Sequence, residues 1–130
     1  MAKISPVHMR QAFDYLLNGP MNGPDSEPKP PLDIIWRWLE AAHVLGQASL
    51  PLHLRAHTAM LHLAWAQGNG REVMGQLLRL ALVPLGHLAK RLPAGNSGRA
   101  HVSAFNPMDP PAEVTALIQQ ALDETRQTAS

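Results

Sequence analysis

Signals that begin and end helices recur along the whole sequence, and they constrain the fold more than any other feature. Ser5 followed by Pro6 is typical of a helix start, with the serine as N-cap and the proline in the first turn. This helix is expected to end near Asn18, because a Gly-Pro pair follows it. Residues 19–31 are rich in proline and glycine and are expected to form an exposed loop.

The same kind of signal predicts three further helices in the middle of the chain. Residues 32–47 carry apolar side chains at helical spacing, and a third helix is expected to continue to Gln67, with Gly68 as its stop. Asn69 has the position of an N-cap for a fourth helix. Pro84 is expected to kink or end that helix, because proline lacks the backbone donor and crowds the preceding turn.

The last part of the chain is expected to combine an irregular segment with one more helix. Residues 93–109 are predicted to be irregular, and residues 125–130 are predicted to fray. The last helix shows a clear apolar stripe, formed by Val114, Leu117, Ile118, Ala121 and Leu122. We therefore expect an all-α fold in which residues 1–130 form a single helical domain. It would be a compact bundle of four to five helices, with a long irregular segment before the C-terminal helix.

Composition narrows the classes of function. A chain of 130 residues can bury a core without covalent staples, and its net charge of +1 gives no electrostatic basis for binding nucleic acid or an anionic membrane surface. The absence of cysteine removes disulfides, thiolate nucleophiles and iron–sulfur ligation. The N-terminal residues lack an apolar signal segment, and the longest apolar stretch is too short to span a bilayer. A cytoplasmic location is expected.

Histidine and glutamate pairs at helical spacing are the strongest functional signal. Glu40 and His43 are three residues apart and can ligate one cation, as such pairs do in four-helix di-iron proteins, although those proteins need a second pair. His53 and His57 are four apart and can chelate one transition ion, as in zinc proteases. Leu54 stands where those proteases have their glutamate, which argues against a protease. Alternatively, both pairs are polar residues satisfied by hydrogen bonds at a helix edge.

Taken together, these residues predict a metal site, because burying several titratable groups is costly unless they are paired or bound to an ion. The expected ligands are His43, His53, His57, Glu40 and Glu72. Glu72 also stands where a capping box has its glutamate, so its role as ligand or cap stays open. Gln47, Gln76 and Arg79 are expected to hydrogen-bond the ligands.

Two glycines predict how these residues would meet. Gly46 and Gly75 each cost their helix about 1 kcal/mol relative to alanine, and such a cost usually allows two backbones to approach closely. We therefore expect the second and fourth helices to cross near these glycines. The crossing would gather His43, Gln47, Glu72 and Gln76 in one neighbourhood.

The donor types predict which ion would be bound. Imidazole and carboxylate donors without thiolate suit a divalent transition metal, zinc or non-haem iron first, with copper or nickel as alternatives. The sequence leaves open whether the ion would activate water or oxygen for a reaction on a small-molecule ligand, or would serve metal handling. The alternative function is a non-enzymatic helical module that recognises a protein partner and whose buried polar residues form a structural hydrogen-bond network.

Two weaker predictions concern other parts of the chain. The glycines around Asn96 and Ser97 could form a backbone nest, with Arg99 as the counter-charge for an anion. A homodimer is expected, because three tryptophans and the leucine-rich helices offer more apolar surface than so small a bundle readily hides. These tryptophans are Trp36, Trp38 and Trp65.

The order of several short motifs resembles a bacterial family of short proteins of unknown function. The motifs are AHVLGQ, LHLRAH, REVMGQLLRL and GNSGRAHVSAFNPM, of which the last is the most specific. The resemblance covers the chain from about the second predicted helix through Met108. It carries no catalytic or binding residues, so none is transferred.

Overall fold

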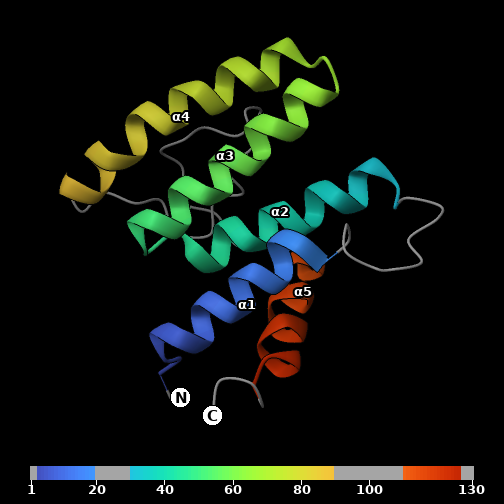
Figure 1. Ribbon diagram of the computed structural model, residues 1–130, viewed down its shortest axis with the longest axis vertical. Coiled ribbons are helices and arrows are strands. Elements are labelled where there is room, and N and C mark those ends of the chain that lie inside the picture. Colours follow the sequence, from blue (N-terminus) through green and yellow to red (C-terminus); the bar gives the residue numbers. More distant parts are fainter. Residues whose placement is uncertain (1–2, 20–29, 90–109, 127–130) are drawn as a thin grey trace.

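Five α-helices make up most of the described part of the chain, residues 3–19, 30–89 and 110–126 of a computed structural model (Figure 1). They are α1 (Pro6–Asn18), α2 (Leu32–Gly46), α3 (Leu50–Ala66), α4 (Gly70–Ala89) and α5 (Ala112–Glu124). The described residues contain no strand. The predicted all-α fold is therefore confirmed.

Side-chain caps and one glycine set the helix boundaries where the sequence predicts them. The Ser5 hydroxyl accepts a hydrogen bond from the backbone N–H of His8 (3.0 Å) and caps α1. The Asn69 side chain accepts one from the backbone N–H of Glu72 (3.1 Å) and caps α4. Between α3 and α4, Gly68 has φ +67°, a left-handed conformation that favours glycine and ends α3.

The helices are arranged in two groups that share α2 (Figure 1). In the first group, α1, α2 and α5 pack against one another around Phe13, Leu16 and Val114, which are almost completely buried. In the second, α3 lies on α2 and α4 lies on α3 in an antiparallel hairpin. A smaller core formed by Trp36, Leu39, Met60, Ala64 and Val73 fills the space between α2, α3 and the start of α4. As a result, α3 lies between α2 and α4.

Helix α4 continues through Pro84 to Ala89, so of the two expected effects of this proline, ending the helix does not occur. Proline has no N–H to donate to the backbone carbonyl four residues earlier in a helix. Because Pro84 is exposed, that carbonyl lies on the side of the helix that water can reach. The extra turn after Pro84 places His87 on the face of α4 that contacts α3.

Several predicted segments lie outside the described residues. These are most of the loop at 19–31, the irregular segment 93–109 with Asn96, Ser97 and Arg99, and residues 127–130. At the C-terminal end of α5, Thr125 is buried and its hydroxyl donates to the backbone carbonyl of Ala121 (2.7 Å). None of the described helices combines the length and the apolar character needed to cross a membrane.

Candidate metal centre

The turn between α2 and α3 brings three histidines together. His43 lies in the last full turn of α2, and the chain then reverses through a hydrogen bond from Ser49 N to the carbonyl of Gly46 (2.9 Å). His53 lies in the first turn of α3, and His57 follows one turn later on the same face. The end of α2 therefore faces the beginning of α3, with all three imidazoles between them.

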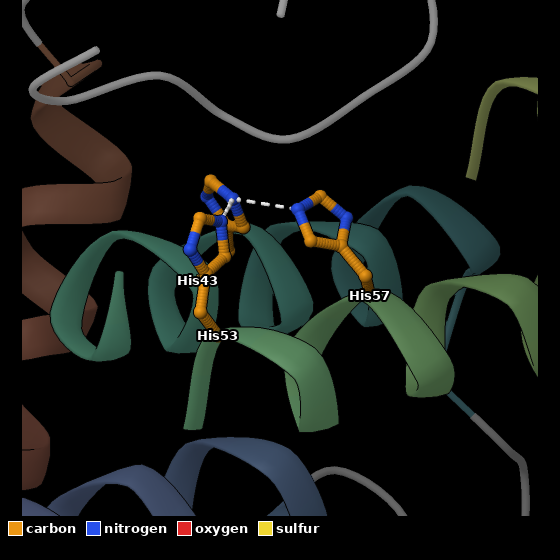
Figure 2. A group of neighbouring side chains, drawn as sticks. All are labelled: His43, His53 and His57. Atoms are coloured by element: carbon orange, nitrogen blue, oxygen red, sulfur yellow. Dashed lines mark hydrogen bonds between the residues drawn. The ribbon is translucent and has the colours of Figure 1, made fainter. Parts of the chain in front are cut away.

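The Nε2 atom of His43 lies close to the Nε2 atoms of both other histidines. Nε2 of His43 lies 3.0 Å from Nε2 of His53 and 3.1 Å from Nε2 of His57. Figure 2 shows the three rings with these nitrogens turned toward one another. All three side chains are buried, with His57 only 1% exposed. In the described part of the chain, this is the group of three or more metal-ligating side chains whose donor atoms lie within 4.8 Å of one another.

The two separations measured from His43 fit a shared metal ion. Two nitrogens that each lie about 2.1 Å from one ion are about 3.0 to 3.4 Å apart, for bond angles between about 90° and 110°. The observed distances of 3.0 and 3.1 Å lie in that range. The same distances also suit direct hydrogen bonds between imidazoles. However, one Nε2 atom carries a single proton or a single lone pair, so His43 cannot form two linear hydrogen bonds from this atom.

The hydrogen bonds of the Nδ1 atoms determine whether Nε2, which faces the other histidines, carries a lone pair or a proton. Nδ1 of His57 lies 2.7 Å from Oε1 of Gln76, and because an amide oxygen only accepts, Nδ1–H of His57 donates. In the neutral imidazole, Nε2 of His57 then carries the lone pair that a metal requires. Nδ1 of His53 lies 3.1 Å from Nε2 of His87, which can play the same part for His53.

The environment keeps two of the rings neutral. Burial, together with the neighbouring His57 and His87, lowers the pKa of His53 to about 3. Burial also lowers the pKa of His57 to about 4, with Arg79 acting in the same direction and Gln76 and Glu72 opposing it. Both side chains are therefore uncharged near pH 7, which is the form of histidine that binds metal.

The inner face of α4 is polar where it meets α3. Glu72, Gln76 and Arg79 are all buried there. Glu72 lies close enough to His57 and Arg79 to affect the pKa of both, and Arg79 Nη1 donates to the carbonyl of Gly75 (3.3 Å). Burial lowers the pKa of Arg79, and the nearby Glu72 carboxylate opposes that shift. A buried carboxyl group, of Glu72, and a buried guanidinium group, of Arg79, thus lie beside the histidine cluster.

Three of the five predicted ligands belong to the histidine cluster. His43, His53 and His57 lie close together, and Gln76 lies within hydrogen-bond distance of His57. Glu40 and Glu72 are not members of the converging group, so their roles as ligands stay predictions. Glu40 is buried on α2, and its Oε2 pairs with Nη1 of Arg37 (3.1 Å). Asn69 caps α4 through the backbone N–H of Glu72. The glutamate side chain is close to His57, so the choice between cap and ligand stays open.

The predicted crossing of α2 and α4 at their glycines is wrong. Among the described helices, α2 packs against α1, α3 and α5, and α4 packs against α3. Gly46 instead allows close packing of α2 against α1 and α3, since a Cβ there would lie 2.9 Å from Leu52 Cβ and from Phe13 Cδ2. His57 contacts both His43 and Gln76. Gln47, at the C-terminal end of α2, is half-buried.

Sequence reasoning missed His87 as a site residue. It lies 11 residues after Gln76, or three helical turns, so the two residues share a face of one unbroken helix. Ending the helix at Pro84 hides this relation. The pattern of Gln76, Arg79, Val83 and His87, at steps of three and four, is the signal that could have found it.

The fold and the site define a small all-α protein with a buried histidine cluster between two helices. Residues 26–118 match the model of a family described as "Protein of unknown function (DUF3703)", and the chain belongs to that family. The matched range includes the whole of α2, α3 and α4, and therefore all the histidines of the cluster and Gln76. It agrees with the expected family of unknown function. No curated protein and no solved structure matches the chain.

Proposed function

We propose that the protein binds one divalent transition-metal ion through Nε2 of His43, His53 and His57. The observation that carries this proposal is the convergence of the three buried nitrogens, with His43 at 3.0 and 3.1 Å from the other two. Zinc and non-haem iron suit a set of neutral imidazoles best, and copper or nickel would accept the same donors.

Three protein ligands leave a coordination position for water or a small molecule. Structural zinc sites usually have four protein ligands, whereas catalytic sites have three and an open position. An ion held here would lower the pKa of a bound water, which supports chemistry on a small-molecule substrate. The same open position would also allow the ion to be passed to another ligand. Glu72 adds a buried carboxylate near His57, which would offset part of the ion's charge.

The competing function is a helical interaction module in which the histidines are purely structural. It is favoured by the fact that His43 lies within hydrogen-bond distance of both His53 and His57. In that case the cluster would stabilise the α2–α3 contact through imidazole hydrogen bonds alone. The two functions differ in whether the folded protein takes up a metal stoichiometrically.

Metal content and metal affinity test the proposal. Protein purified without a histidine tag should contain about one transition ion per chain, measured by elemental analysis. The variants His53→Gln and His57→Gln should lose it, because glutamine keeps much of the volume but removes the imidazole donor. His62→Gln is the matched control: His62 is on the same helix but exposed, so this variant should bind metal like the wild type.

Titration of metal-free protein with Co²⁺ gives a second readout. Binding at the three nitrogens should produce visible absorption bands of four- or five-coordinate cobalt in the wild type and in His62→Gln, but not in His53→Gln. A wild-type protein that contains no metal, shows no cobalt spectrum and keeps the same melting temperature with added zinc would overturn the proposal in favour of the structural network.

A further inference from the structure

The outer face of α4 is apolar along most of its length. Between Met74 and Leu88, every exposed residue of this helix is apolar. These residues are Met74, Leu77, Leu78, Ala81, Pro84, Leu85 and Leu88, called the α4 stripe below. Leu88 is 82% exposed and Leu78 57%. Within this stretch the polar side chains of Gln76 and Arg79 are buried, so the outer face is more apolar than that of an ordinary surface helix.

The stripe is straight and regular. Met74, Ala81 and Leu88 are seven residues apart, as are Leu78 and Leu85, so these side chains form one band along the helix. At 1.5 Å per residue the band is about 22 Å long, and with a helix about 10 Å across its area is a few hundred Å². Contiguous apolar patches of this size mark interaction surfaces.

Within the described part of the chain, no helix covers this band. α4 packs against α3 alone among the described helices (Figure 1). The residues that contact α3 include Gln76 and His87, which are not part of the stripe. Trp65, near the end of α3, is 75% exposed and adds further apolar surface close to the α3–α4 turn. Exposing so much apolar surface to water is unfavourable, by roughly 25 cal/mol per Å².

We propose that the α4 stripe is covered by the α4 stripe of a second copy of the chain. A two-fold interface places the same patch on both sides, so the patch must be complementary to itself. The stripe carries no charged side chain, so pairing it with a second stripe places no like charges against each other. A lipid surface is a poorer match, because helices that bind membranes carry several basic residues beside the apolar face. Among the described side chains of α4, Arg71 is the exposed basic residue.

The size of the stripe predicts how stable the dimer is. A stable interface buries about 800 Å² on each partner, which is more than the stripe alone provides. The pair is therefore expected to form at micromolar concentration and to dissociate on dilution. This proposal is independent of metal binding, because the stripe lies on the face of α4 that is turned away from α3 and the three histidines.

Sedimentation equilibrium of the full chain over a hundredfold concentration range tests it. The wild type should pass from monomer to dimer, and Leu78→Glu and Leu85→Glu should stay monomeric with an unchanged helical circular dichroism spectrum. Val7→Glu is the matched control: Val7 is 56% exposed, nearly the same as Leu78, but lies on α1. This variant should dimerise like the wild type.

Cross-linking gives a second test, made simple because the chain has no cysteine. Ala81 is the midpoint between Met74 and Leu88, so a two-fold pairing of the stripe brings the two copies of Ala81 together. Ala81→Cys should form a disulfide-linked dimer on mild oxidation, and Ala116→Cys, at an exposed alanine of α5, should not. A wild type that stays monomeric throughout, equal dimerisation of Leu78→Glu, or equal cross-linking of the two cysteine variants would overturn the proposal.

Discussion

Nε2 of His43 on α2 lies 3.0 Å from Nε2 of His53 on α3, across the turn that joins the two helices. The same atom lies 3.1 Å from Nε2 of His57, one turn further along α3. The cluster thus joins the end of one helix to the beginning of the next, at the place where the two groups of helices meet. An ion at this point would connect both groups, so changes to the histidines should affect stability as well as metal binding.

The stability of the metal-free protein should fall as the pH is lowered from 7 to 5. The pKa of His53 is lowered to about 3 and that of His57 to about 4, from 6.5 in the unfolded chain. Below pH 6.5 the unfolded state therefore binds protons that the folded state excludes, and folding becomes less favourable until the folded pKa values are reached. Urea unfolding in the presence of EDTA at several pH values measures this.

The double variant His53→Gln/His57→Gln separates these residues from the other titrating groups. Its stability should depend less on pH over the same range, because glutamine does not titrate. His62→Gln should keep the full pH dependence, since His62 is exposed. A double variant with the same slope as the wild type would mean that neither buried imidazole is responsible.

Replacing Gln76 should weaken both the fold and the metal site. Gln76→Leu leaves the buried Nδ1–H of His57 without its acceptor, which should cost about 1 to 3 kcal/mol of unfolding free energy. It should also lower metal affinity, because the ring is no longer held with its lone pair toward His43.

Gln76→Glu is the informative comparison. It keeps an acceptor oxygen for His57 and adds a negative charge, so zinc affinity should recover to the wild-type value or exceed it. Competition with a coloured chelator measures both variants. Equal zinc affinity in wild type and Gln76→Leu would show that Gln76 has no part in presenting His57.

His87→Ala should lower zinc affinity by about tenfold, the usual effect of removing a hydrogen-bond partner of a ligating histidine. Nε2 of His87 lies 3.1 Å from Nδ1 of His53, on the side of that ring away from His43. His87→Gln can still offer an acceptor and should recover part of the affinity, whereas His62→Ala should change nothing. Zinc affinity that is the same in His87→Ala and His62→Ala would exclude the role of His87.

Gly46→Ala should destabilise the protein although alanine favours helix by about 1 kcal/mol. Its Cβ would lie 2.9 Å from Leu52 Cβ and from Phe13 Cδ2, too close for either to remain in place. Overpacking of this kind costs about 1 to 3 kcal/mol. Gly70→Ala is the control, because a Cβ at Gly70 meets nothing within 4 Å. Thermal unfolding should show a lower melting temperature for Gly46→Ala alone.

Local sequence determined the helices. Ser5 and Asn69 are caps that act within three residues, and Gly68 ends α3 because its left-handed backbone suits glycine. For the same reason His53 and His57 could be placed on one face of one helix before any tertiary contact was known. These predictions depend on neighbours within one or two turns, and such relations are visible in the chain itself.

Only the tertiary structure decided which residues meet across helices. Gly46 was expected to contact α4 but packs on Phe13 and Leu52, because α3 lies between α2 and α4. His87 joins the cluster because α4 continues beyond Pro84. Tertiary packing of α4 outweighs the local free-energy cost of a proline inside the helix. Helix periodicity gives each residue a direction from its own axis, but the position of one axis relative to another depends on how all the side chains pack together.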